Sequence, residues 1–124
     1  GLIAAEFGDS TGLKIGERVV AIGNADIRLN FLEMLKSAGY KLPAIISPRA
    51  WVSPSAKIGE GVVIEPNATV STSAEIGFGC FVCAGAVVNH NGVLCDGSQA
   101  NCNATVSARA QIPYKKKSQC GEVF

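Results

Sequence analysis

One side chain in this 124-residue sequence can act as a general base near neutral pH, and that is His90, its single histidine. An imidazole gains and loses a proton in the physiological range, so it can take a proton from a hydroxyl or an amine. Asn89 and Asn91 stand on either side, and an amide can orient the ring but cannot stabilise an imidazolium as a carboxylate does. The sequence therefore offers proton transfer at His90, with a solvated surface histidine as the alternative.

The five cysteines offer thiol chemistry. An odd number of cysteines in a sequence without a secretion signal predicts free thiols rather than a disulfide framework. Cys80 and Cys83 have the CxxC spacing of half a zinc site, but Cys95, Cys102 and Cys120 are irregularly placed and do not supply the other half. We therefore expect buried or incidental thiols and no metal.

A repeat with a period of six residues must position these side chains. Every sixth residue is aliphatic or alanine at twelve consecutive positions: Ile46, Val52, Ile58, Ile64, Val70, Ile76, Val82, Val88, Leu94, Ala100, Val106 and Ile112. A small residue stands two positions earlier in almost every unit. Three positions later, seven units have a residue that enters the left-handed backbone region cheaply: Gly61, Asn67, Gly79, Gly85, Asn91, Gly97 and Asn103. This pattern predicts a mainly β fold, a left-handed parallel β-helix of about four triangular coils built from hexapeptide repeats.

Three units make a coil of about eighteen residues, so residues that far apart lie on neighbouring coils. His90 then falls at an outward corner between Thr72 and Ala108, two small residues that leave an open shelf. The outward positions form three ladders: Ile45, Val63, Phe81 and Gln99; Trp51, Thr69, Val87 and Thr105; Lys57, Glu75, Val93 and Gln111. Because the first two ladders expose apolar groups, we expect self-association, with a threefold ring as the natural closed assembly and a dimer not excluded.

A short α/β cap is expected before the prism. Residues 18–22 are a short apolar run that predicts a strand. Ile27, Phe31 and Leu35 recur at the spacing of one helix face, with Leu32 beside them. The helix is expected to end near Gly39. We expect this cap to pack on the end of the prism.

The chain is predicted to divide into three parts. The truncated cap covers residues 1–43, the β-helix covers 44–113, and a C-terminal tail covers 114–124. The first residue is glycine rather than methionine, which is typical of a fragment, a processed product or a tagged protein.

Charge and hydropathy argue against several functions. The net charge is +1 with both signs scattered, so there is no electrostatic footprint for nucleic acid. No stretch reaches the length of a membrane span and nothing resembles a signal peptide, so we expect no membrane partner and a cytoplasmic location. One histidine cannot supply the three zinc ligands of the β-helical carbonic anhydrases, and no ladder has the run of threonines typical of ice-binding solenoids.

From residue 19 to about residue 112, the sequence resembles the bacterial hexapeptide acyltransferases of the NeuD/PglD type, which acetylate sialic acids or UDP-linked amino sugars. The similarity lies in Ala21-Ile22-Gly23-Asn24 followed by Ile27-Arg28, in Ile46 to Ser53, in Ala56 to Gly61 and in Gly85 to Asn91. The resemblance implies a homotrimer with acetyl-CoA bound between neighbouring prisms. It also implies a sugar or nucleotide-sugar acceptor whose amine or hydroxyl is deprotonated by His90.

The resemblance assigns further roles and shows departures. Ala108 matches the residue whose backbone amide polarises the thioester. Gln99 matches a second family histidine near the thioester, and its amide can still donate a hydrogen bond to a carbonyl. Asn89 or Asn91 stands where the family has an acidic residue beside the catalytic histidine, and residues 1–17 lack the family's glycine-rich acceptor loop.

Lys115 and Lys116 belong to a run of three lysines that could meet the phosphates of CoA, with a solvated tail as the alternative. Together these features predict a CoA-dependent acetyltransferase that works by direct attack, without a covalent enzyme intermediate. The alternative is a catalytically weak or inactive hexapeptide-repeat scaffold.

Overall fold

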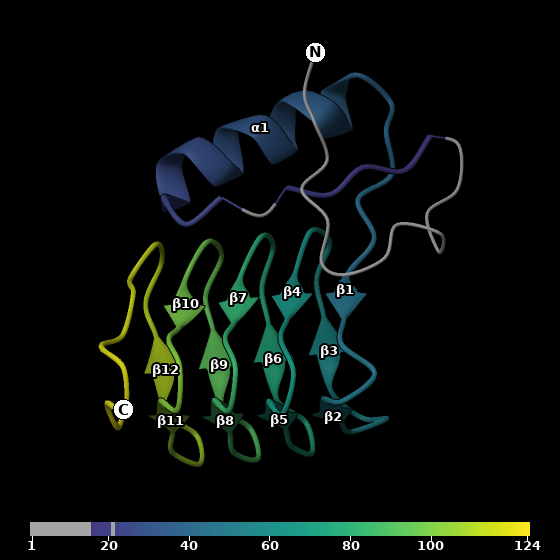
Figure 1. Cartoon of the computed structure of the whole chain (residues 1–124). Helices are drawn as coiled ribbons and strands as arrows, with labels where there is room; N and C mark the ends of the chain where they lie inside the picture. The colour runs from purple at the N-terminus through teal and green to yellow at the C-terminus, as the bar shows by residue number, and fades with distance from the viewer. Residues whose placement is uncertain (1–15, 21) are drawn as a thin grey trace.

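The computed structural model describes residues 16–20 and 22–124, and in that part of the chain it has one helix and twelve two-residue strands. Helix α1 spans Ala25–Ser37. The strands are β1 (Ile45–Ile46), β2 (Trp51–Val52), β3 (Lys57–Ile58), β4 (Val63–Ile64), β5 (Thr69–Val70), β6 (Glu75–Ile76), β7 (Phe81–Val82), β8 (Val87–Val88), β9 (Val93–Leu94), β10 (Gln99–Ala100), β11 (Thr105–Val106) and β12 (Gln111–Ile112). They form three four-stranded parallel sheets, β1-β4-β7-β10, β11-β8-β5-β2 and β12-β9-β6-β3 (Figure 1). The predicted solenoid of about four coils is confirmed.

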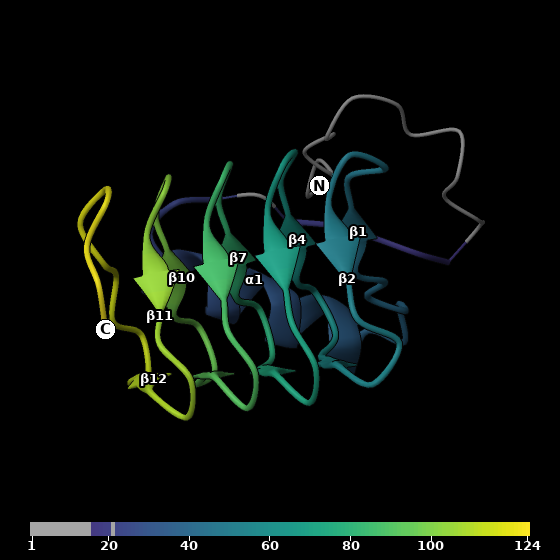
Figure 2. The same ribbon diagram turned by 90° about the horizontal axis from the view of Figure 1, so that it is seen from below.

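The register between coils is the predicted one. Ile45 pairs with Val63, and Val63 pairs with Phe81, so paired residues are one coil of 18 residues apart in the sequence. The same register holds in the other two sheets, where Trp51 pairs with Thr69 and Lys57 with Glu75. Figure 2 shows the coils stacked side by side along one axis. The three outward ladders expected from the sequence are therefore correct.

The interior of the prism is filled from the aliphatic and the small positions of the repeat. Its buried cluster comprises Val62, Ile64, Ala68, Val70, Ala74, Ile76, Cys80, Val82, Ala86, Val88, Leu94, Ala100, Val106 and Ile112. Each unit alone exposes these side chains, and only stacking removes them from water. Close packing along the axis is therefore what holds the coils in register.

The corners need backbone with positive φ, and all seven predicted residues adopt it, with φ between 58° and 70°. The same corner position also holds Ser73, Arg109 and Lys115, at φ 56°, 63° and 59°. A side chain with a Cβ atom costs about 1 kcal/mol or more in this conformation. Stacking on neighbouring coils therefore imposes the corner even where the residue type does not favour it.

The backbone continues the coil path beyond Ile112. Lys117 bridges to Gln99 and Val123 bridges to Thr105, both in parallel. Gly121 has φ 71°, which is the corner conformation again. Residues 114–124 thus lie on the end of the stack and cover the last complete coil.

Helix α1 lies along one edge of the prism and not on its end, which corrects the expected position of the cap (Figure 1). An added Cβ at Gly79 would come within 2.7 Å of Leu29 and 2.9 Å of Leu32, and one at Gly97 within 2.6 Å of Leu29. Glycine at these two corners gives both the positive φ and the close approach. The helix therefore packs on the corners of successive coils.

The packing face of α1 also differs from the predicted one. Its buried residues are Arg28, Leu29, Leu32 and Leu35. Ile27 is 47% exposed and Phe31 is only partly buried, so of the four predicted residues only Leu32 and Leu35 are buried. The face is turned because the helix runs along the glycine corners, where Leu29 and Leu32 fit. At its start, the side chain of Asn24 accepts a hydrogen bond of 3.0 Å from the Ile27 N–H.

The strand predicted over residues 18–22 does not form among the described residues of that segment. Glu17 makes a single parallel bridge with Lys41, and the Arg18 N–H donates to the Lys41 carbonyl at 2.9 Å. Ala21 lies outside the described residues. Val19 and Val20 are nevertheless buried, so the apolar run reflects packing beneath α1 rather than pairing in a sheet.

Only one of the two apolar ladders is open to solvent. Trp51 on β2 is 55% exposed, whereas Val63 and Phe81, on the β1-β4-β7-β10 sheet, are buried within the chain. The sequence treats all outward positions alike, because it does not reveal that the cap lies over one edge. In the described part of the chain, no helix is both long enough and apolar enough to cross a bilayer.

Candidate active site

His90 lies at the corner between β8 and β9, and its side chain is exposed, as predicted. Its Nδ1 is 3.2 Å from Oδ1 of Asn91. If Nδ1 carries the proton and donates it to this oxygen, Nε2 keeps its lone pair and faces solvent as the basic atom. Asn91 therefore selects the tautomer that a general base needs.

The backbone around His90 is held by the neighbouring coils. The Asn91 N–H donates to the Thr72 carbonyl at 3.0 Å, and the Arg109 N–H donates to the His90 carbonyl at 3.2 Å. Thr72 and Ala108 are both exposed, which confirms the open shelf on either side. The Ala108 N–H makes no hydrogen bond to another described residue, so it can donate to a bound group beside the imidazole.

Gln99 lies on β10, in a different sheet from the strands that flank His90. The corner that carries His90 joins the β8 sheet to the β9 sheet, whereas Gly97, just before Gln99, lies at the corner after β9. One chain therefore presents these two side chains on different edges of the prism. The structure does not bring His90 and Gln99 together within one copy.

The amide of Gln99 is held in a buried network. Its Nε2 donates to Oδ1 of Asn101 at 2.7 Å and contacts Sγ of Cys83 at 3.4 Å. Nδ2 of Asn101 in turn donates to the Ser118 carbonyl at 2.7 Å. Gln99 is 8% exposed, and its Oε1 has no hydrogen-bond partner in the described part of the chain. The group that Gln99 offers is thus an acceptor, and the donor role expected for it would require Nε2 to leave Asn101.

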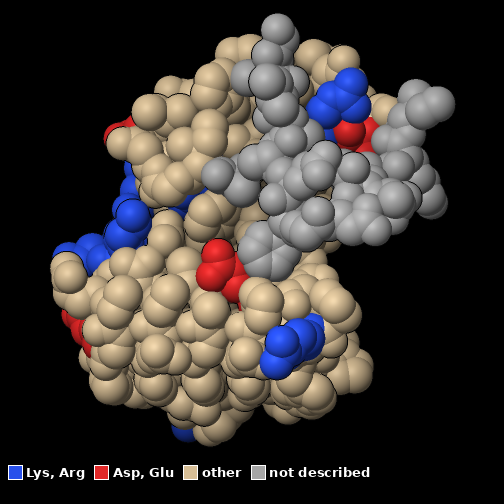
Figure 3. Space-filling view, in the orientation of Figure 1, with Lys and Arg blue, Asp and Glu red and all other residues tan. Residues whose placement is uncertain are grey.

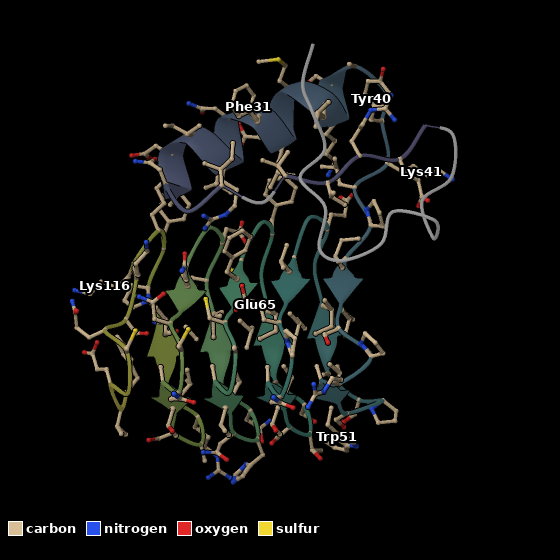
Figure 4. All side chains as sticks on the ribbon, viewed as in Figure 1. Phe31, Tyr40, Lys41, Trp51, Glu65 and Lys116 are labelled. Atoms are coloured by element: carbon tan, nitrogen blue, oxygen red, sulfur yellow. The ribbon has the colours of Figure 1, made fainter. Side chains whose placement is uncertain are left out.

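A cavity of about 280 Å³ adjoins Gln99, between the start of α1 and the last coils. Its lining is Gly23, Asn24, Ala25, Asp26, Arg28, Gly97, Gln99, Lys115 and Lys117. Figure 3 shows Lys and Arg side chains gathered on this side of the molecule, where the helix meets the coils. Within it, Nζ of Lys115 lies 2.6 Å from Oδ1 of Asp26. Lys116 points away from the last coil (Figure 4) and does not line the cavity.

Known proteins resemble the chain in sequence and in structure. The sequence model of the bacterial transferase hexapeptide, with six repeats, matches residues 55–90. The acetyltransferase domain of PglB from Neisseria gonorrhoeae FA1090 superposes with a TM-score of 0.83 at 33% identity, over 85% of this chain and 51% of that one. The chain thus contains hexapeptide repeats of the bacterial transferase type and is similar to this acetyltransferase domain in sequence and fold.

Further comparisons define the extent of the similarity. The same PglB domain has been solved in complex with acetyl coenzyme A. A mutant of perosamine N-acetyltransferase from Caulobacter crescentus, with CoA and GDP-perosamine, gives a TM-score of 0.57 at 19% identity, over 86% of this chain and 62% of that one; it shares the fold alone. No curated protein sequence matches the chain. The chain spans about half the length of the PglB domain.

The arginine that attaches helix α1 to the coils was not predicted from the sequence. The guanidinium of Arg28 is fully buried and donates to three carbonyls, of Gly79 at 2.7 Å, Ile22 at 2.6 Å and Gly97 at 2.9 Å. Its Cζ lies 4.4 Å from the ring centroid of Phe81. Burial lowers the pKa of Arg28, yet guanidinium stays charged at neutral pH. A single arginine on a leucine-rich helix face was the available signal.

The five thiols of the chain are all free. Cys80 and Cys83 are buried, whereas Cys102 and Cys120 are exposed. Burial, with the nearby Glu65 carboxylate second, raises the pKa of Cys83 to about 11, although the hydrogen bond from Gln99 opposes the shift. Among the described residues, no three His, Cys, Asp or Glu side chains form a group that could hold a metal ion.

Proposed function

We propose that the protein transfers an acetyl group from acetyl-CoA to a hydroxyl or an amine of a sugar or nucleotide-sugar acceptor. The observation that carries the proposal is the exposed corner of His90, where Asn91 orients the only histidine beside the free Ala108 N–H. The 33% identical PglB acetyltransferase domain, which has been solved with acetyl coenzyme A, supports acetyl-CoA as the co-substrate.

The reaction follows from the two groups at this corner. Nε2 of His90 takes the proton as the acceptor oxygen or nitrogen attacks the thioester carbonyl carbon. The carbonyl oxygen becomes an oxyanion, which the Ala108 N–H can stabilise by donation. When the tetrahedral intermediate collapses, the C–S bond breaks and the imidazolium returns its proton to the CoA sulfur. No covalent bond to the protein forms at any step.

The complete site is proposed to lie between copies of the chain, in a homotrimer. His90 and the cavity beside Gln99 lie on different edges of one prism, so a neighbouring copy is needed to bring such edges together. The exposed Trp51 ladder offers an apolar surface for that contact. Figure 4 shows Trp51 on this outer surface, far from the helix.

The CoA phosphates are proposed to meet Lys116 first. Lys116 is exposed and carries its charge away from the last coil. Lys115 can join it only by leaving Asp26, since the two form an ion pair at 2.6 Å. We also propose that the protein acts in the cytoplasm.

The second candidate function is an inactive or weakly active scaffold. The observation that favours it is the amide beside His90, because Asn91 cannot stabilise an imidazolium as a carboxylate can. A scaffold of this kind would retain CoA affinity without turnover.

Two measurements separate these functions. Calorimetric titration of acetyl-CoA, with the mass in solution measured in parallel, should give one site per subunit of a trimer. His90→Ala should lower kcat by about a hundredfold to ten thousandfold, and leave the melting temperature close to wild type because the exposed ring has no core contacts. Gln111→Ala, an exposed substitution on β12, is the control and should keep full activity. CoA binding without turnover on any amino sugar would identify a scaffold, and no affinity at millimolar CoA would rule out both functions.

A further inference from the structure

We propose that Cys102 and Cys120 form a redox-active pair, which reacts with a low-molecular-weight disulfide and becomes an intramolecular disulfide that fastens the last coil. Both thiols are free and exposed in the structure. This modification site lies at the C-terminal end of the prism, and it does not depend on the acetyltransferase function.

The two cysteines occupy equivalent positions on successive coils. They are 18 residues apart, which is one coil, and of the five cysteines no other two have this spacing. The parallel bridges on either side of them have the same register: Gln99 with Lys117, and Thr105 with Val123. Between these bridges, the Gly121 N–H donates to the Cys102 carbonyl at 2.9 Å. Backbone contacts therefore hold Cys120 directly beside Cys102.

The backbone turns in the same way after both cysteines. Asn103 follows Cys102 with φ 58°, and Gly121 follows Cys120 with φ 71°. Equivalent side chains on stacked coils project in the same direction. Neighbouring parallel strands lie about 4.8 Å apart, and the Cα atoms of disulfide-bonded cysteines are usually about 4.4 to 6.8 Å apart. The spacing of the coils is therefore within the range of a disulfide.

Two other positions show that side chains one coil apart contact each other. Sγ of Cys80 lies 3.7 Å from Oγ of Ser98. Sγ of Cys83 lies 3.8 Å from Oδ1 of Asn101. In both cases the equivalent residue of the next coil has no thiol, so no disulfide can form there. A thiol stacks on a thiol only at Cys102 and Cys120.

Exposure also separates this pair from the other cysteines. Cys80 and Cys83 are buried and Cys95 is half-buried. A disulfide in solution reacts only with a thiol that it can reach. Access and a neighbouring thiol therefore occur together only at the C-terminal end of the prism.

The reaction consists of two thiol–disulfide exchanges. In the first, the thiolate of one cysteine attacks a sulfur of the small disulfide, whose S–S bond breaks and releases one small thiolate. In the second, the thiolate of the other cysteine attacks the protein sulfur of the mixed disulfide and releases the second small thiolate. Two protein thiols are thus oxidised to one disulfide, and the small disulfide is reduced to two thiols. The two protons lost by the cysteines are taken up by the released thiolates.

The new bond fastens the segment that covers the last complete coil. Residues 114–124 have a neighbouring coil on one side only in the described part of the chain (Figure 2), and Phe124 packs against the buried cluster of the prism. A terminal unit of a solenoid opens most readily because it has a single interface. A covalent link to Cys102 restricts residues 103–119 in the open state. Oxidation therefore holds the last coil closed.

The test is incubation of the reduced full chain with glutathione disulfide, followed by mass spectrometry of the intact protein and of its nonreduced digest. The wild type should lose two hydrogens and carry no glutathione, because the second exchange is intramolecular. The digest should contain the peptide of Cys102 linked to the peptide of Cys120. Cys102→Ser and Cys120→Ser each prevent the second exchange, so each variant should accumulate protein with one glutathione attached. Cys95→Ser keeps the pair and is the matched control, which should behave as the wild type does.

Hydrogen exchange measures the effect on the last coil. The amides of Ser118, Gly121 and Phe124 donate to the preceding coil. They should exchange about tenfold more slowly in the oxidised wild type than in the reduced protein. In Cys120→Ser, treatment with glutathione disulfide should leave their exchange rates unchanged.

Three results would overturn the proposal. The first is a wild type that keeps both thiols at millimolar glutathione disulfide or accumulates the glutathione adduct as the single variants do. The second is a disulfide that joins two copies of the chain instead of Cys102 to Cys120 of one copy. The third is an intramolecular disulfide that leaves the exchange of residues 114–124 unchanged.

Discussion

The corner of His90 and the cavity beside Gln99 are opposite kinds of polar site. At the corner, an exposed imidazole has one amide neighbour, Asn91, and a wide approach from solvent. In the cavity, a buried amide is fixed by Asn101, and cationic side chains surround the space next to it. The corner has a base without a binding pocket, and the cavity has a pocket without a base. Each lacks what the other supplies, which is why we propose a site formed by two copies of the chain.

The two places also differ in how they are built. The corner follows from the repeat alone, because any unit at that position projects its side chain outwards. The cavity needs three separate segments, namely the start of α1, strand β10 and the coil after Ile112. Proton transfer tolerates an exposed position, whereas selective binding requires buried groups held in fixed orientations.

The largest expected effect tests whether the two places work together across copies. His90→Ala and the double variant Gln99→Met/Lys117→Gln should each be nearly inactive alone. For the double variant, we expect the acetylation rate at low acceptor concentration to fall by about a hundredfold. Co-expressed, they should recover about a quarter of wild-type activity, because random mixing in a closed ring pairs an intact His90 with an intact cavity that often. The measurement is the acetylation rate of the purified mixed assembly.

The control for this experiment is a mixture of the separately purified variants, assayed before their subunits have time to exchange. It should show only the sum of the two residual activities. The same sum from the co-expressed assembly would mean that each chain uses its own His90 and its own cavity, and the comparison between the two edges would lose its functional meaning.

The second prediction removes the residue that attaches the cavity wall. Arg28→Met keeps the length of the side chain but leaves the carbonyls of Ile22, Gly79 and Gly97 without their donor. We expect a loss of about 3 kcal/mol or more in the free energy of docking α1, since buried carbonyls are left unpaired. Hydrogen exchange measured at increasing denaturant concentration should show the backbone amides of α1 exchanging at low denaturant while those of the prism stay protected. The reason is that parts of a repeat array can unfold independently.

Arg49→Met is the matched control, since Arg49 is exposed on the corner after β1. It should change stability by less than about 0.5 kcal/mol. Should Arg28→Met instead unfold prism and helix in one step, the cap would be part of the cooperative core and the cavity could not open separately.

These regions also mark how far the sequence could lead. The twelve strands, their register and the outward position of His90 follow from the six-residue period, because stacking places equivalent residues of successive coils side by side. The period does not distinguish the first coil, where the inward residue Ile46 is 41% exposed. The face of α1 followed only in part. Leu32 and Leu35 are buried as predicted, but Ile27 and Phe31 satisfy the helical period as well as Leu29 does. Only the glycine corners of the prism decide between them.

The hydrogen bonds of the polar side chains that line the cavity could not be predicted from the sequence. The orientation of Gln99 depends on Asn101, which depends on the Ser118 carbonyl, and no local pattern encodes such a chain. The same holds for Arg28, whose partners Gly79 and Gly97 lie more than one coil away in the sequence. Repeat periodicity fixes positions, but hydrogen-bond networks depend on which distant atoms those positions bring together.

The third prediction compares a corner covered by α1 with one that is open. Gly79→Ala and Gly121→Ala both place a Cβ at positive φ, 65° and 71°, at a cost of about 1 kcal/mol each. At Gly79 the new atom also meets Leu29 at 2.7 Å, whereas at Gly121 nothing lies within 4 Å. We expect Gly79→Ala to lose about 1–2 kcal/mol more than Gly121→Ala in thermal denaturation. Equal losses would show that α1 does not press on this edge.

The smallest effect concerns the thiol beneath Gln99 and tests whether that side of the molecule is dry. Burial raises the pKa of Cys83 to about 11, from 9.0 for an unperturbed thiol. The folded chain therefore keeps this proton up to a higher pH than the unfolded chain does. The stability that depends on it is complete below pH 9 and is lost as the pH rises through 11. Between pH 8 and pH 11, the urea midpoint of the wild type should fall further than that of Cys83→Ser. The m-value of a small protein sets the expected difference at a few tenths of a molar, on the order of magnitude.

The control is Cys102→Ser, which removes an exposed thiol and should keep the wild-type dependence of the urea midpoint on pH. If Cys83→Ser keeps it too, water reaches the thiol. Oε1 of Gln99 would then be hydrated, and the contrast between a wet corner and a dry cavity would not hold.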